Sequence, residues 1–540
     1  MRTADPFRSI HVAALGLCLI LLPWSTALLS MAQILLVINW IAEGLIRKDN
    51  ERWSRAFRPA PALFIGFFLL HVIGLLWTSS EGLKWGLDLV RIILPMLVFG
   101  VVLGSSPRLD RIEYGMILLL GAWSVVASTI VCVISEGWLA DYRDLSVFIS
   151  HIRLAMLLCL SIVILIHFAG GSAWRMIAHL AAVIWCVIFL DRLGSMQSFL
   201  VLVLVAIALL WRWSRQRPKI LKWAIRTASI VPLIIGIGWI ALQLKERYAF
   251  NDHSTQDLPR QSAGGEAYVH MADRQMENGE RVWSRIAWGE VDRVWYRRSS
   301  MRLDSLDGRG HLLYPTLFRY LASLDLPKDS AGIMSLSDTD VDRVEAGIPS
   351  ALWGTRSRLH DRFDEVMFEI DQYFSEGRVS GHSVPMRLEF WKAGIAIASR
   401  HLLIGVGTGD TQIEFDREYE RMNTSLAKEW RHRAHNQYLT LLISFGVPGL
   451  LFAIVCVWWP AWRMKAWRRD LFVAWVIIIG IGSLSDDTIE TQAGATLFAL
   501  YYALFVFASP VMQETSDRNR GKMEVLGGVD DDLTLIDASR

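Results

Sequence analysis

The residues best suited to chemistry in this sequence form a short polar cluster, RHRAHN, at positions 431–436. Arginine guanidinium groups, here those of Arg431 and Arg433, can bind phosphate oxygens through two parallel hydrogen bonds. A histidine such as His435 has an ordinary pKa of about 6.5 and accepts a proton at neutral pH. The cluster therefore predicts a site that binds phosphate and moves a proton. The alternative is that it only begins a helix at a membrane interface, with Asn436 as the N-terminal cap.

Further charged residues stand in or beside apolar segments, where charge is costly and is generally either functional or paired. Asp88 and Arg91 are three residues apart on one helix face, so we expect an ion pair between them. Arg153, Arg192 and the acidic stretch 486–490 lie at the ends of other apolar segments. Any single arginine of this kind could simply extend its guanidinium to the lipid headgroups. Together with the RHRAHN cluster, these residues predict a cationic pocket on one side of a membrane.

The elements that would position these residues are predicted from composition and hydropathy. The chain has 540 residues, is 53% hydrophobic with a mean hydropathy of +0.33, and carries 20% charged residues, against about 25% in soluble proteins. Apolar runs close to the roughly 20 residues needed to cross a bilayer recur along it, so we expect an all-α polytopic membrane protein. Twelve spans are expected, at approximately 9–24, 27–46, 60–78, 83–104, 112–135, 152–169, 174–190, 195–211, 223–244, 434–459, 470–485 and 491–510.

Charge in the connections between these spans predicts their orientation, because arginine and lysine gather in short cytoplasmic connections. Connections 47–58, 105–111, 212–222 and 460–469 are rich in both residues and alternate with connections that are not. Both termini are therefore expected in the cytoplasm, and residues 245–433 on the outer side, the periplasm of a bacterium. The N-terminal apolar run has no cleavage site and is expected to remain as a membrane anchor.

Four regions follow from this pattern. Residues 1–244 are expected to form transmembrane helices 1 to 9, and residues 434–512 to form helices 10 to 12. Between them, residues 245–433 are expected to form a mostly helical periplasmic domain, since the segment 364–374 has helical spacing. The acidic and polar residues 513–540 are expected to be a disordered cytoplasmic tail.

Composition and motifs also exclude several classes of function. The five cysteines all lie in apolar runs, so neither a disulfide framework nor a thiolate metal site is expected. The net charge of +2 gives no sign of nucleic-acid binding, because the charges are sorted by their place along the chain. The sequence contains no Walker loop or other ATPase motif, and no cofactor is expected.

Two stretches carry a resemblance to a known family. His435 and Asn436, followed after nine residues by Gly446 and after two more by Gly449, resemble the signature of the O-antigen ligase/polymerase family. RLEFWKAGIAIASRHLLIGVGTGD, at 387–410, resembles the stretch around that family's periplasmic arginine. SHIRLAMLL, LDLPKDSAGIMSL and SDDTIETQAGATLFALYYALF are similar to forms of the family of the Bacteroidetes type.

The resemblance implies an inverting, metal-independent glycosyltransferase of the polytopic GT-C type in the bacterial inner membrane. Ligases of this family move a finished polysaccharide from undecaprenyl diphosphate to a sugar hydroxyl of lipid A-core, on the periplasmic face. The implied partners are thus an undecaprenyl-diphosphate-linked glycan donor, a lipid A-core or other glycan acceptor, and membrane lipids. The alternatives are an O-antigen polymerase or a protein O-oligosaccharyltransferase that uses the same donor, and, from another class, a transporter.

The resemblance also implies roles for particular residues. His435 matches the family histidine that activates the acceptor hydroxyl or positions the diphosphate, and Arg387 matches the arginine expected to bind donor diphosphate. Arg153 matches an arginine at the start of a middle span and is expected to face phosphate. Arg433 and Asn436 are expected to contact substrate beside them.

One position departs from the family pattern. Many members carry an arginine where this chain has Met196, after Ser195. Arg192 lies four residues earlier and could take the place of that arginine if the helix extends outward, since residues four apart share a helix face. Gly446 and Gly449 are expected to kink the helix whose outer end presents the histidine.

Overall fold

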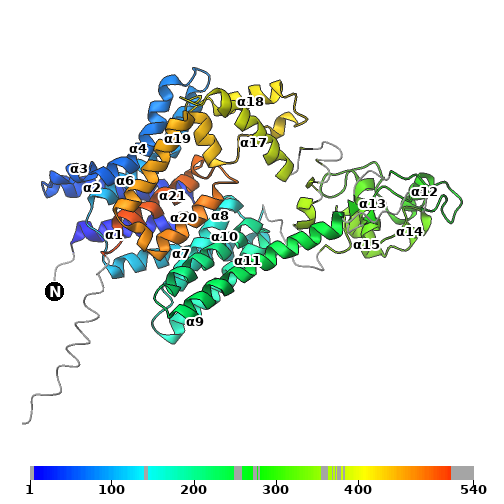
Figure 1. The fold of residues 1–540 in the computed structure, drawn as a ribbon, viewed down its shortest axis with the longest axis horizontal. Coiled ribbons are helices and arrows are strands. Elements are labelled where there is room, and N and C mark those ends of the chain that lie inside the picture. Colours follow the sequence, from blue (N-terminus) through cyan, green and yellow to red (C-terminus); the bar gives the residue numbers. More distant parts are fainter. Residues whose placement is uncertain are drawn as a thin grey trace, which may run out of the picture.

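The chain folds almost entirely into helices in a computed structural model, which is shown in Figure 1. The structure describes residues 5–138, 144–248, 258–271, 276–277, 280–353, 363–367, 369–370, 373, 379–380 and 383–511. The expected tail at 513–540 lies outside these residues.

The first half of the chain supplies most of the membrane-type helices. They are α1 Pro6–Leu21, α2 Thr26–Ile46, α3 Glu51–Ala56, α4 Pro59–Ile73, η1 Gly74–Trp77, α5 Leu83–Ile92, α6 Leu94–Ser105, α7 Arg111–Glu136, α8 His151–His167, α9 Ala173–Arg192, α10 Met196–Ser214 and α11 Lys219–Tyr248. The second half continues with β1 Met276–Glu277, β2 Glu280–Arg281, α12 Trp288–Arg298, α13 Leu313–Ser323, α14 Ser330–Met334, α15 Asp338–Glu345, α17 Ser383–Arg400, α18 Thr411–Arg421, η3 Lys428–Trp430, α19 Gln437–Arg463, η4 Ala466–Arg468, α20 Asp470–Gly482, η5 Thr488–Glu490, α21 Gln492–Ala503 and the π-helical turn η6 Leu504–Ala508.

The expectation of an all-α polytopic membrane protein is confirmed. Within the described residues, eight helical segments are long and apolar enough to cross a membrane, and four shorter apolar helices accompany them. Each of the twelve expected spans coincides with one of these segments. The fourth span consists of α5 and α6, which meet at Ile93.

The first two expected spans are separate helices rather than one kinked helix. α1 ends at Leu21, and Ser25 accepts a hydrogen bond from the backbone N–H of Leu28 and so caps α2. A serine at this position satisfies one of the backbone donors that the first turn of a helix leaves open. The two helices then pack against each other, and α1 also packs against α7.

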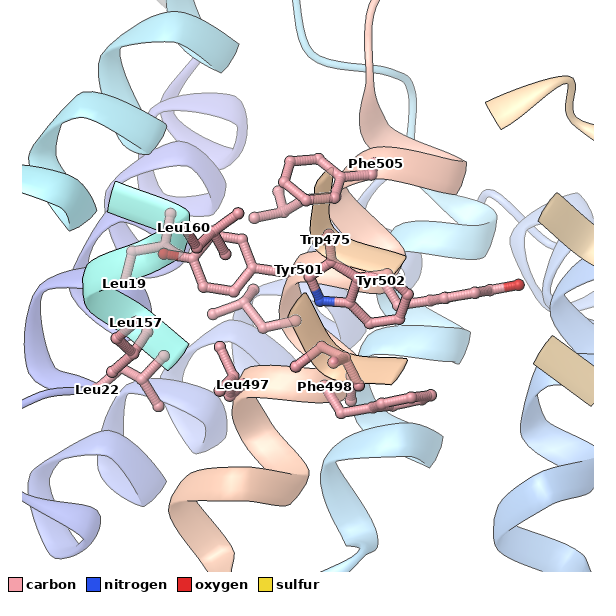
Figure 2. Close-up of a cluster of buried hydrophobic side chains, with 14 of the residues drawn as sticks. Leu19, Leu22, Leu157, Leu160, Trp475, Leu497, Phe498, Tyr501, Tyr502 and Phe505 are labelled. Carbon is pink, nitrogen blue, oxygen red and sulfur yellow. The ribbon is translucent and has the colours of Figure 1, made fainter. Parts of the chain in front are cut away.

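The centre of the bundle is an aromatic cluster on α20 and α21 (Figure 2). The rings of Phe498 and Tyr502 stack, and Trp475 packs against both of them. The Tyr502 hydroxyl donates a hydrogen bond of 2.7 Å to the carbonyl of Val457, so the buried polar group is satisfied. Helices in a membrane gain little from apolar burial, because lipid is equally apolar; close van der Waals packing of this kind holds them together.

The connection after α11 contains a second hydrophobic cluster, beyond the end of that long helix in Figure 1. Trp295 of α12, together with Leu317 and Phe318 of α13, is fully buried there. β1 and β2 form an antiparallel hairpin beside these helices. The described part of 364–374 is helical at 364–367, 369–370 and 373.

α17 and α18 belong to a third hydrophobic cluster, which they share with the start of α19. Phe390 and Ile397 of α17 meet Phe415 of α18, together with Ala434 and Ile443 of the chain entering and forming α19. This packing fixes the segment 431–436, in which the predicted site lies.

Candidate active site

His435 sits in a backbone conformation that the surrounding chain imposes. Its φ is +44°, in the left-handed region that non-glycine residues rarely adopt, and such strain is concentrated at functional sites. Immediately after it, Asn436 caps α19 by accepting hydrogen bonds of 3.1 Å from the backbone N–H groups of Tyr438 and Leu439. The capping role considered for Asn436 is therefore the one its side chain has in this structure.

Aromatic residues of α17 and α18 hold this segment from one side. The Trp391 indole donates a hydrogen bond of 3.1 Å to the carbonyl of Ala434, and the Tyr419 hydroxyl donates one of 2.6 Å to the carbonyl of His432. The ring of Phe390 lies 5.6 Å from that of His435, centroid to centroid. The imidazole is thus placed by packing against rigid helices.

The break in α19 at Gly446 supports the same arrangement from below. Gly446 has φ +65° and ψ −173°, and the helix changes direction there. The freed carbonyls of Ile443 and Ser444 accept hydrogen bonds of 2.9 Å from the backbone N–H groups of Val406 and Gly407. The irregular backbone is satisfied inside the protein, as membrane depth requires. This agrees with the kink expected at Gly446.

The acidic segment between α20 and α21 meets the cluster from the other side. Asp487 accepts hydrogen bonds from the backbone N–H of Asn436 at 3.1 Å and from the Thr440 hydroxyl at 2.8 Å. Asp486 pairs with Arg153 at 2.8 Å. Glu490 pairs with Arg433, and both of these groups are largely buried. The sequence placed this stretch on the same side as the cluster but gave no pairing between the two.

Five of the six predicted site residues gather around this junction. Arg153, Arg433, His435 and Asn436 are joined by the contacts given above. Arg387 lies on α17 one turn before Phe390, and its positive charge acts on both His435 and Asp486.

Arg192 lies elsewhere in its described contacts. Its guanidinium donates a hydrogen bond to the carbonyl of Trp138 and sits 5.2 Å from the centroid of the Trp138 ring. Arg192 is not among the residues that line the cavity at His435. The side chain nearest in sequence to the missing family arginine that does reach the acidic segment is Gln197, which accepts a hydrogen bond of 2.5 Å from the Ser485 hydroxyl.

A cavity of about 280 Å³ opens at the junction. It is lined by Trp85, Gln412, His432, Arg433, His435 and Asp487. Trp85 of α5 and Gln412 of α18 were not anticipated, because nothing in their local sequence distinguishes them from other residues at helix ends. Only the folded arrangement brings these distant segments together.

The environment of the cavity favours a neutral imidazole. Burial lowers the pKa of His435 to about 4; the charges of Arg387, His432 and Arg433 also lower this pKa, and Asp487 opposes them. At neutral pH the ring is uncharged and can accept a proton. Burial also raises the pKa of Asp486 to about 6, an effect that Arg153 partly offsets and Asp487 reinforces.

The arrangement supports acid–base and phosphate chemistry. A neutral histidine beside several guanidinium groups can take a proton from a hydroxyl while cations stabilise a departing phosphate. Among the described residues, no group of three or more histidine, cysteine, aspartate or glutamate side chains could hold a metal ion.

Fold and site together define a multi-pass α-helical membrane protein with a cationic, histidine-containing cavity at one end of its apolar helices. Residues 348–454 match the family model described as O-antigen ligase. This segment includes Arg387, His435, Gly446 and Gly449, and the match supports assigning the chain to the O-antigen ligase family. It also supports glycosyl transfer of the ligase or polymerase type. A search of curated proteins found none that matches the chain.

Proposed function

We propose that this protein is an O-antigen ligase of the bacterial inner membrane. It transfers a polysaccharide from undecaprenyl diphosphate to lipid A-core on the periplasmic face, with both of its own termini in the cytoplasm. The observation that carries the proposal is the neutral His435 among Arg387, Arg433 and Arg153, within or beside the segment that matches the family model.

The proposed reaction is a single displacement at the anomeric carbon of the donor sugar. The acceptor hydroxyl attacks that carbon as the bond to the diphosphate breaks, so the configuration inverts. His435 takes the hydroxyl proton, which its lowered pKa leaves room for at neutral pH. The bond electrons leave with the undecaprenyl diphosphate, whose growing charge Arg387 stabilises, with Arg433 and Arg153 adding positive potential.

The donor itself would supply the free energy of the transfer. A preassembled lipid diphosphate already contains the bond that is broken, so neither a nucleotide nor a metal ion has a step to perform. The proposed domain at 245–433 would extend from the same side as the cavity, and Arg192 would act outside the reacting groups.

Envelope glycan analysis of the source bacterium tests the proposal. Wild type, a deletion strain and a strain carrying His435→Ala would be compared at matched protein levels. Loss of the lipopolysaccharide ladder in both mutants, with long polymer accumulating on undecaprenyl diphosphate, is the expected result.

Other outcomes identify other functions. Core carrying a single repeat unit would indicate a polymerase instead, and loss of glycan from proteins alone would indicate a protein O-oligosaccharyltransferase. An unchanged glycan profile in all three strains would overturn glycosyl transfer and favour a transporter.

A further inference from the structure

One large aromatic side chain in the cavity has no part in the proton or phosphate chemistry. Trp85 of α5 lines the cavity together with His435, and its side chain remains 40% exposed. A tryptophan on the wall of a polar cavity presents a flat apolar face beside hydrogen-bonding groups, and ligand sites combine these two features.

The backbone holds Trp85 in place from below. Gly82 and Gly86 lie against the backbone of Gly409, and a Cβ at Gly86 would be 3.3 Å from the Cα of Gly409. These glycines let α5 approach the loop that leads into α18 more closely than other residues would. The loop is fixed in turn, because Asp410 accepts two hydrogen bonds of 2.7 Å from Ser79.

The ring of Trp85 is also oriented by its neighbours in the cavity. The Arg433 guanidinium lies 5.0 Å from the ring centroid, within the range of a cation–π contact. Arg433 is held by its buried ion pair with Glu490, and α5 packs against η5, which contains Glu490. The indole is therefore a preorganised surface rather than a freely rotating side chain.

We propose that Trp85 forms a sugar-binding subsite, on which a pyranose ring of the substrate stacks beside His435. The inference rests on the proposed glycosyl transfer and adds a residue that selects for carbohydrate. The weakly polar C–H face of a pyranose fits an aromatic face, while its hydroxyls can reach the polar walls at Gln412 and Asp487. The sugar belongs either to the donor, next to its diphosphate, or to the acceptor.

Steady-state kinetics of the full-length protein in lipid nanodiscs test this subsite. The substrates are undecaprenyl-diphosphate-linked glycan and lipid A-core extracted from the source strain. Trp85→Leu removes the aromatic face and keeps an apolar side chain, so it should raise the KM for one substrate about ten-fold, corresponding to roughly 1.4 kcal/mol. Its kcat should fall by less than about three-fold, and Trp85→Phe should restore most of the affinity.

Trp77→Leu is the matched control. Trp77 lies in η1, which packs against α5, and it is 36% exposed but does not line the cavity. A raised donor KM for Trp85→Leu would place the sugar on the donor side, and a raised acceptor KM would place it on the acceptor side. Both results support the subsite, provided that Trp77→Leu leaves both KM values unchanged.

Three results would overturn the inference. Unchanged KM values in Trp85→Leu would mean that the ring only lies at the membrane interface. A loss confined to kcat, or a Trp85→Phe variant as impaired as Trp85→Leu, would mean that the residue only supports Arg433. A wild-type protein that transfers no glycan would overturn the proposed function and this subsite with it, whereas transfer by wild type with an unaffected Trp85→Leu overturns the subsite alone.

Discussion

The buried residues around His435 determine which of them can act as base and which as cation. Burial and three neighbouring positive charges lower the pKa of the imidazole to about 4, so His435 is free of its proton at neutral pH. Each of Arg153 and Arg433 has a carboxylate beside it. The net charge of the site is therefore smaller than its arginines alone suggest, and a donor diphosphate would enter a field that is positive but partly compensated.

Substitution of Arg387 should impair transfer at least as severely as substitution of His435. Stabilisation of the departing charge is often the largest single contribution to catalysis, whereas a general base typically contributes about 10²–10⁴-fold. Arg387→Ala should therefore lower the transfer rate by at least about 100-fold in membranes that contain equal amounts of protein.

Arg387→Lys is the control for charge alone. It keeps a cation but not the planar pair of donors that fits a diphosphate, so its activity should lie between wild type and Arg387→Ala. An Arg387→Ala protein with full activity at normal expression would show that another group binds the diphosphate.

The stability of the Arg153 and Asp486 pair should depend on pH in a definite direction. Because burial raises the pKa of Asp486 from 3.8 to about 6, the folded state takes up a proton between these values that the unfolded state does not. Relative to Asp486→Asn, wild type should become more stable as the pH falls from 7 to 4, by on the order of 2 kcal/mol. Thermal unfolding of both proteins in detergent measures this, and parallel pH curves would contradict it.

The sequence was sufficient for the cluster itself but not for its partners. His435 and Arg387 stand in stretches with a recognisable pattern, and Asn436 follows the preference of helix caps. Glu490 and Trp85 reach the site from helices about 60 and 350 residues away, and only packing decides that they face Arg433. Arg192 shows the converse, since helical spacing alone could not reveal that Trp138 would take its guanidinium.

At the scale of elements, the break in α19 should be the least replaceable feature. Gly446→Ala forces an L side chain into a φ of +65°, which costs roughly 1–2 kcal/mol. Its Cβ would also lie 2.6 Å from the carbonyl oxygen of Leu402. The variant should unfold at a lower temperature and lose transfer activity, because His435 sits at the outer end of the same helix.

Gly480→Ala provides a matched comparison in α20. A Cβ there would meet only the Tyr438 hydroxyl oxygen, at 3.6 Å. Alanine in a helix interior is favoured over glycine by roughly 0.5–1 kcal/mol, so this variant should be as stable as wild type or slightly more so. Equal effects of the two substitutions would mean that the break in α19 carries no special constraint.

Element positions were largely predictable because long apolar runs leave few alternatives in a bilayer. The Gly-Val-Pro-Gly stretch at 446–449 announced a kink, since proline and glycine interrupt helical hydrogen bonds. What could not be read was the identity of the segment that satisfies the freed carbonyls. Val406 and Gly407 do so through backbone groups, which no side-chain pattern specifies.

For the whole molecule, the orientation in the membrane rests on arginine and lysine in the connections, and cysteine labelling can test it. All five native cysteines are buried within apolar helices and should not react. Ser54 and Ser300 are exposed, the first in α3 between two expected spans and the second just after α12 in the segment expected outside. Ser54→Cys and Ser300→Cys therefore make equally mild single-site probes.

In cells with a permeabilised outer membrane, a membrane-impermeant maleimide should label Ser300→Cys but not Ser54→Cys. Ser54→Cys should become reactive once detergent opens the inner membrane. This pattern places the cavity at His435 on the periplasmic side, because the segment that contains Ser300 and the chain entering α19 belong to the same connection. The reverse pattern would put His435 in the cytoplasm, where lipid A-core linked to finished polysaccharide is not made, and the ligase proposal would fall with it.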